Sequence, residues 1–197
     1  MHAMTLLPVR AARPELSVIA RGLRRCDPEL LDSLIEQYQH RLLRYLSHLL
    51  SDRELARDLC QETWIRVLER GHQYNSRYKF STWLYTIARN IALDHLRKRR
   101  SISLEGLTSE HEDSVFEPRD VQPLAWELLE QREQAERIHT ALLGIPAQYR
   151  EAVVLRFQEE LALNEIATVV GAPLGTVKSR LARGLNLLME QLKEVRL

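Results

Sequence analysis

Cysteine, glycine and proline are scarce in this chain of 197 residues, which holds two cysteines, seven glycines and seven prolines. Neither Cys26 nor Cys60 belongs to a CxxC pair or lies near histidines with the spacing of a zinc site, so we expect no metal centre. We interpret both as reduced thiols, because structural disulfides are rare in the cytoplasm, where we expect the protein to reside.

Long apolar runs and enzyme motifs are also missing. No stretch approaches the roughly 18 apolar residues of a membrane span, and no apolar core of a secretory signal follows the arginines near the N-terminus. We therefore expect no membrane insertion. The sequence shows no phosphate-binding glycine loop, nucleophile elbow, metal cluster or paired carboxylates. We predict a protein that is not an enzyme and carries no cofactor.

The few glycines and prolines lie mostly at breaks between helical segments. None occurs between Glu29 and Arg70 or between His72 and Glu105, and both spans repeat apolar residues at helical spacing. We predict an all-α protein without a β-sheet, although EAVVLRF at 151–157 is rich enough in β-branched residues to suggest a strand. The expected helices span about 15–25, 28–50, 52–70, 81–100, 124–143, 146–159, 163–170 and the segment after the proline at 173.

The net charge of +1 hides a strong segregation of charge along the chain. Residues 71–100 carry seven lysines or arginines against one aspartate, a net charge of +6. Residues 101–130 carry eight acids against one arginine, net −7, and residues 171–197 carry five basic residues against two acids, net +3. We therefore predict an N-terminal extension at 1–15 and two small helical domains, at 16–100 and 124–197, joined by an acidic, flexible linker at 101–123.

The segment 163–188 has the pattern of a DNA-binding helix-turn-helix. Gly171 and Pro173 mark the turn, because glycine adopts the left-handed angles that end a helix and proline suits a helix start. In the second helix, Lys178, Ser179 and Arg183 lie outside the apolar stripe. A polar, basic helix after a tight turn is typical of a recognition helix, and an ordinary helical hairpin with a solvated face is the alternative.

Three motifs occur in order: DLCQETW at 58–64, FSTWLYTIARN at 80–90 and GTVKSRL at 175–181. Together they resemble the bacterial RNA polymerase sigma factors of the extracytoplasmic-function (ECF) class, within the sigma-70 family. The resemblance implies that 16–100 is sigma region 2, which binds core polymerase and recognises and melts the −10 promoter element. It implies that 124–197 is sigma region 4, which reads the −35 element. The implied partners are core RNA polymerase, promoter DNA and an anti-sigma factor. No motif in this sequence points to the anti-sigma factor, which the resemblance alone implies.

For the −35 element we expect Lys178, Ser179 and Arg183 to contact bases or the adjacent backbone. Thr176 and Arg180 are expected to hold phosphates, which position the helix without specifying sequence.

The sequence departs from the family at two places. Gly184 and Leu185 stand where a small residue and a basic residue are usual, and a glycine inside a helix costs ~1 kcal/mol relative to alanine. Cys26 stands where a glycine is common.

For the −10 element the resemblance points to the loop at 71–80 and the helix after it. Melting favours a protein that prefers single strands, and stacking on aromatic side chains supplies ~1–3 kcal/mol per base. We expect Asn75 to hydrogen-bond a base edge and Tyr74 or Tyr78 to stack on one, with core packing as the alternative for each aromatic. Trp83 is assigned to the core. The predicted −10 residues are Tyr74, Asn75, Arg77, Tyr78, Lys79, Arg89, Asn90, Arg97 and Lys98.

By resemblance, polymerase binds the helix that carries DLCQETW. The predicted contact residues are Asp58, Gln61, Glu62 and Trp64. Exposed acids on a helix usually form only a solvated face, so this assignment depends on the family. The acidic linker is either a solvated tether or a nucleic-acid mimic that lies in a basic polymerase channel. The alternative function is a stand-alone helix-turn-helix transcriptional regulator, which would bind duplex operator DNA without polymerase.

Overall fold

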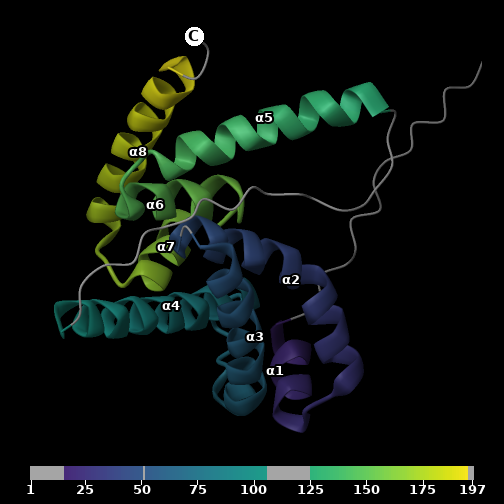
Figure 1. Ribbon diagram of the computed structural model, residues 1–197. Helices are drawn as coiled ribbons and strands as arrows, with labels where there is room; N and C mark the ends of the chain where they lie inside the picture. Colours follow the sequence, from purple (N-terminus) through teal and green to yellow (C-terminus); the bar gives the residue numbers. More distant parts are fainter. Residues whose placement is uncertain (1–15, 51, 106–124, 195–197) are drawn as a thin grey trace, which may run out of the picture.

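The computed structural model describes residues 16–50, 52–105 and 125–194, and the regular structure in these ranges is entirely helical (Figure 1). The helices are α1 (Leu16–Arg25), α2 (Pro28–Leu50), α3 (Arg53–Arg70), the 3-10 turn η1 (Gly71–Gln73), α4 (Phe80–Glu105), α5 (Ala125–Leu143), α6 (Ala147–Phe157), α7 (Leu163–Val170) and α8 (Leu174–Glu194). The predicted all-α fold is confirmed, and the strand-like segment 151–157 lies within α6. The predicted N-terminal extension and residues 106–123 of the predicted linker lie outside the described residues.

Aspartate side chains cap the N-termini of α2 and α3. Asp27 accepts hydrogen bonds from the backbone N–H groups of Glu29 (3.1 Å) and Leu30 (3.4 Å) at the start of α2. Asp52 accepts one from Leu55 N–H at 3.1 Å at the start of α3. Cys26 ends α1 with a positive φ of 51°, the left-handed conformation that explains why glycine is common at this position.

Helices α1–α4 form an N-terminal body in which α3 packs against α2 and α4. Its core contains Leu42 and Leu46 of α2, Val67 of α3 and Leu84 of α4, each at most 1% exposed. Burial of such side chains stabilises a fold by ~1.5–3 kcal/mol each, before the loss of conformational entropy is counted.

Helix α4 is longer than the sequence predicts. It begins at Phe80 and continues to Glu105, so it includes residues 101–105 of the predicted linker. The sequence 101–105 contains no glycine or proline that would end a helix, and the first break is Gly106. Helix α4 therefore extends five residues beyond position 100, where the sequence analysis places the end of the first domain.

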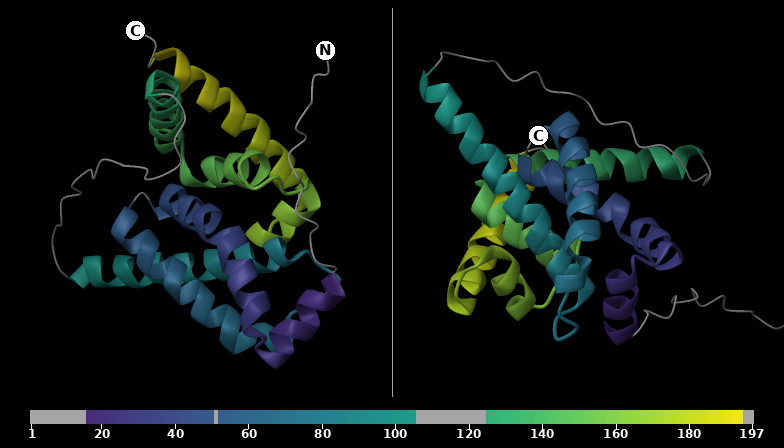
Figure 2. Two further views of the ribbon diagram at one scale, coloured as in Figure 1. Left: turned by 90° about the vertical axis from the view of Figure 1, so that its right-hand side faces the viewer. Right: turned by 90° about the horizontal axis from the view of Figure 1, so that it is seen from below.

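Helices α5–α8 form a C-terminal body that packs directly on the N-terminal body. The contacts join α4 to α7 and α2 to α6, with a smaller contact between α2 and α5. Figure 1 shows α7 directly above α4, and the left view of Figure 2 shows the C-terminal body seated on α2 and α4. None of the helices in the described ranges has the length and apolar character needed to cross a membrane.

Candidate nucleic-acid and polymerase interfaces

The helix-turn-helix predicted at 163–188 is formed by α7 and α8. Glu165 accepts a hydrogen bond from Ala162 N–H at 2.7 Å and so satisfies one free donor at the start of α7. Gly171 ends α7 with φ 62° and ψ 39°, in the left-handed conformation that the sequence predicts for it. Ile166 and Val177 are 0% and 1% exposed and join the two helices to the core.

The recognition helix α8 presents its predicted −35 residues as two groups. Lys178, Ser179 and Arg183 are exposed, whereas Thr176 and Arg180 are half-buried. Spacing of one and four residues places the exposed three on one side of the helix. This is the geometry of side chains that can enter a major groove while flanking residues lie nearer the scaffold.

The structure explains why a glycine stands at position 184, which the sequence alone does not. It lies buried where α8 crosses α6. A Cβ atom at this position would lie 2.8 Å from Val153 Cγ2 and 2.9 Å from the backbone oxygen of Tyr149. The two helices approach too closely there for any side chain.

In the −10 loop, the prediction for Tyr74 as a stacking platform is contradicted by its burial, at 1% exposed. Its ring packs against Phe80 and Trp83, with centroids 5.9 and 5.2 Å away, and its hydroxyl donates to the backbone oxygen of Tyr78 at 2.7 Å. Burial raises the pKa of Tyr74 to about 12. Tyr74 therefore supports the loop from beneath, and Trp83 packs against the same core as predicted.

Tyr78 is the aromatic side chain that the loop exposes, at 52%. Asn75 Oδ1 accepts a hydrogen bond from Arg77 N–H at 3.0 Å, and the Tyr78 N–H donates to the Asn75 backbone oxygen at 3.1 Å. These bonds shape a tight turn. The side chains of Asn75, Arg77, Tyr78 and Lys79 are all exposed.

The remaining predicted −10 residues lie along α4 and differ in accessibility. Asn90, Arg97 and Lys98 are exposed. Arg89 is largely covered, and its Nε lies 2.7 Å from Glu151 Oε1 of α6. Lys79 also has a partner in the C-terminal body, because its Nζ lies 2.9 Å from Glu165 Oε1 of α7.

On α3, three of the four predicted polymerase-contact residues are accessible. Asp58 and Gln61 are exposed and Glu62 is half-buried. The prediction for Trp64 is contradicted, because its side chain is 9% exposed and belongs to the core. It lies one residue from the buried Thr63, on a face that α3 packs between α2 and α4.

Two apolar residues that the sequence analysis missed occupy the accessible face of α3. Ile65 and Leu68 are 54% and 47% exposed, and they follow Asp58, Gln61 and Glu62 at helical spacing. Both fall outside the apolar stripe of the helix, which is the signal that could have identified them. Exposed apolar side chains among polar ones are typical of a surface that binds another protein.

Comparison with known proteins agrees with the architecture. The Sigma-70 region 2 family matches residues 34–102, and the Sigma-70 region 4 family matches residues 135–188. The chain is 29% identical to the ECF RNA polymerase sigma factor SigW of Bacillus subtilis (strain 168), over 89% of this chain and 95% of that protein. It is 32% identical to SigX of the same organism, over 85% of this chain and 86% of that protein.

A solved structure with a similar fold is the sigma factor RpoE in complex with the anti-sigma factor NepR from Bartonella quintana. Its TM-score is 0.70 at 25% identity, covering 82% of this chain and 96% of that chain. A second is CnrH in complex with the cytosolic domain of CnrY, with a TM-score of 0.64 at 18% identity, covering 90% and 96%.

Proposed function

The chain belongs to the ECF class of the sigma-70 family, and from this we propose which of its residues carry out the function of a sigma factor. A protein of this family binds core RNA polymerase and directs it to promoters. It is an initiation factor rather than an enzyme, and it acts where polymerase is, which for a bacterial chain is the cytoplasm.

Promoter recognition at the −35 element is assigned to α8. Lys178, Ser179 and Arg183 contact the bases or the adjacent backbone, and Thr176 and Arg180 hold phosphates on either side. A good bidentate contact to a base supplies ~1–3 kcal/mol of discrimination. The observation that carries this assignment is the exposure of the first three side chains on one face of α8 while Val177 anchors the helix in the core.

Recognition and melting at the −10 element are assigned to the turn after η1 and to α4. Tyr78 stacks on an unpaired base and Asn75 hydrogen-bonds a base edge, while the buried Tyr74 holds the backbone of Tyr78 in place. The other side chains of this surface contact the DNA backbone: Arg77, Lys79, Arg89, Asn90, Arg97 and Lys98.

Binding to core polymerase is assigned to the accessible face of α3. Asp58, Gln61 and Glu62 supply polar contacts, and Ile65 and Leu68 supply the apolar centre that an interface of useful affinity needs. An anti-sigma factor is a further partner, as in the RpoE complex with NepR.

The test is a pull-down with purified core polymerase followed by run-off transcription on a promoter mapped from transcript starts after overexpression. A sigma factor confers specific initiation on the core enzyme. A stand-alone regulator would instead bind duplex DNA without polymerase and would leave purified core enzyme inactive on that promoter.

Residue roles are tested in the same assay with Tyr78→Ala and Tyr78→Phe. The alanine variant should lose open-complex formation, measured by permanganate reactivity of unpaired thymines, while retaining core binding. The phenylalanine variant keeps the stacking surface and should remain active. Equal activity of the alanine variant would refute the stacking role.

A further inference from the structure

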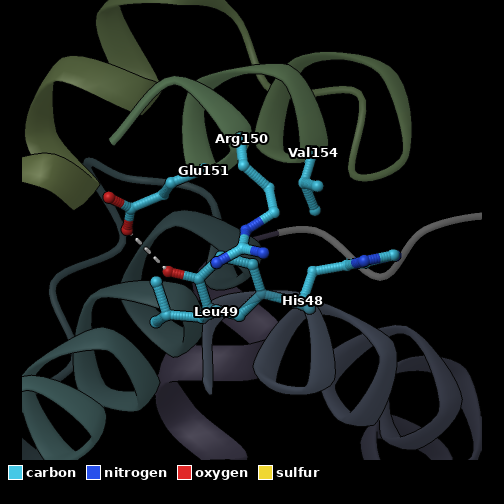
Figure 3. Close-up of a pocket in the computed structure, with 6 residues that line it drawn as sticks. His48, Leu49, Arg150, Glu151 and Val154 are labelled. Carbon is cyan, nitrogen blue, oxygen red and sulfur yellow. Dashed lines mark hydrogen bonds between the residues drawn. The ribbon is translucent and has the colours of Figure 1, made fainter. Parts of the chain in front are cut away.

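Three acidic side chains of the C-terminal body contact the N-terminal body, and two of them bind residues that are assigned to DNA. Glu151 of α6 lies at the centre of this contact. Its Oε1 lies 2.7 Å from Arg89 Nε and accepts a hydrogen bond from the Tyr45 hydroxyl at 3.0 Å. Figure 3 shows the Glu151 carboxylate pointing from α6 towards that hydroxyl. The side chains of Arg89 and Glu151 are only 17% and 5% exposed, so solvent screens this ion pair little.

Glu159, just after α6, makes the second contact. Its side chain is 0% exposed and accepts hydrogen bonds from Arg41 Nε at 3.0 Å and from the Tyr85 hydroxyl. Arg41 also donates to the backbone oxygen of Gln158 at 3.2 Å. Burial raises the pKa of Glu159, against the opposing effects of Tyr85 and Arg41. Both donors, from α2 and α4, reach Oε2 and favour the charged form while the side chain is buried.

Glu165 of α7 makes the third contact at the edge of the interface. Its Oε1 lies 2.9 Å from Lys79 Nζ, and its other carboxylate oxygen caps α7. Two residues of the predicted −10 surface, Arg89 and Lys79, thus both bind carboxylates of the C-terminal body. Carboxylate and phosphate oxygens are alike in the charge-assisted hydrogen bonds that they accept from arginine and lysine.

The other functional surfaces remain accessible in this arrangement. Lys178, Ser179 and Arg183 on α8 are exposed, as are Asp58 and Gln61 on α3. The contact between the two bodies therefore covers part of the surface assigned to the −10 element and leaves the polymerase-binding and −35 surfaces open.

We propose that the free chain is closed and self-inhibited: Glu151 and Glu165 occupy Arg89 and Lys79, which promoter DNA requires, and Glu159 helps to hold the two bodies together through Arg41 and Tyr85. This inference depends on the proposed function. Polymerase can bind the accessible face of α3 while the chain is closed, and separation of the C-terminal body then frees Arg89 and Lys79. The closed state prevents the free protein from occupying single-stranded DNA without polymerase.

The size of the effect follows from linkage. If DNA binds only the open state, the apparent dissociation constant is the intrinsic one divided by the open fraction. A change that raises the open fraction from about 1% to about 10% therefore tightens apparent binding about tenfold.

The experiment uses the full chain with Glu151→Gln and Glu159→Gln together, which removes two charges and keeps the side-chain shapes. The matched control is Glu136→Gln with Glu190→Gln, which removes the same charge from exposed positions of the C-terminal body. The DNA probe is a fluorescein-labelled single strand carrying the non-template −10 sequence of the mapped promoter. Binding is measured by anisotropy.

The arrangement of the two bodies is measured separately by single-molecule energy transfer. Dyes are placed at Ser33→Cys on α2 and Asn186→Cys on α8, both exposed positions, with Cys26→Ser removing the exposed native thiol. Wild type should show mainly a high-transfer population. The Glu151 and Glu159 double variant should show a lower-transfer population and bind the probe at least about tenfold more tightly, and the control should match wild type.

A mainly low-transfer wild type, or a double variant that opens without gaining affinity, would overturn the proposal. So would a double variant that equals the control in both measurements. Circular dichroism checks that the helix content is kept. If it is not, Arg41→Gln, which breaks the same interface from the N-terminal body, replaces the double variant with the same expected result. Run-off transcription by wild type with core polymerase tests the proposed function independently.

Discussion

Gly184→Ala tests whether close approach of α6 and α8 outweighs helix propensity. Inside a helix, alanine is favoured over glycine by ~1 kcal/mol, so propensity alone predicts stabilisation. The structure predicts the opposite. The new methyl group would lie 2.9 Å from the Tyr149 backbone oxygen, which cannot rotate away, and 2.8 Å from Val153 Cγ2. Val153 is β-branched and stiff at χ1 in a helix, so α6 and α8 must move apart.

Overpacking of this kind costs ~1–3 kcal/mol. Subtracting the gain in propensity leaves a net destabilisation of about 1 kcal/mol. For a chain of this size this lowers the melting temperature by about 2–4 °C. Differential scanning calorimetry at neutral pH measures the shift.

The matched control is Gly175→Ala in the first turn of the same helix. A Cβ at Gly175 meets no atom within 4 Å, so this substitution should raise the melting temperature slightly. The opposite signs of the two substitutions are the diagnostic result. A rise in melting temperature for Gly184→Ala equal to that for Gly175→Ala would refute the reasoning.

Three further predictions address the functional surfaces and the interface. Lys178→Ala with Arg183→Ala should abolish promoter-specific run-off transcription while core binding in a pull-down persists; loss of core binding would mean that the α8 face is wrongly assigned. Ile65→Ser should weaken binding to core polymerase about tenfold or more in a titration, since an apolar side chain buried in an interface supplies ~1.5–3 kcal/mol. The same substitution should leave the melting temperature within about 2 °C of wild type, because the side chain is exposed in the free chain. Stability should also depend on pH through His48, whose pKa is lowered to about 3 by burial and then by neighbouring positive groups. The unfolded His48 side chain has a pKa near 6.5, so the stability that neutral His48 contributes to the folded chain is complete above that pH and declines as the pH falls towards 3. Between pH 7.5 and 5.5 the free energy of unfolding should fall by about 1 kcal/mol. The raised pKa of Glu159 changes the stability with pH in the opposite direction. The measurement is therefore the difference in melting temperature between wild type and His48→Asn, taken at both pH values. The same difference at both pH values would refute the role of His48.

Features set by neighbours in the sequence were predictable. Asp27 and Asp52 cap helices through hydrogen bonds to residues two or three positions ahead, and Gly171 ends a helix through its own backbone angles. Each signal and the structure it specifies lie within one helical turn. The order and type of the helices could therefore be predicted before any contact between them was known.

Burial was predictable only where one apolar stripe defined it. Trp64 is adjacent to the buried Thr63, and the buried face of α3 is wide there because α3 packs against both α2 and α4. Tyr74 lies in a segment without helical periodicity, so no pattern could separate it from Tyr78. Two tyrosines four residues apart have opposite environments, and one holds the backbone of the other through its hydroxyl.

The contact between the two bodies could not have been predicted from charge patterns, since these count residues that are near in sequence. Glu151 and Arg89 are separated by 62 residues and Glu159 and Arg41 by 118. In sequence, an acid on a predicted helix is most simply a solvated residue. The Glu159 side chain is 0% exposed and carries a large desolvation cost, which Arg41 and Tyr85 of the other body offset through bonds to Oε2. In the proposed closed state, carboxylates of the C-terminal body and promoter DNA compete for Arg89 and Lys79. The relative free energies of the closed and open states then set when the chain binds unpaired DNA.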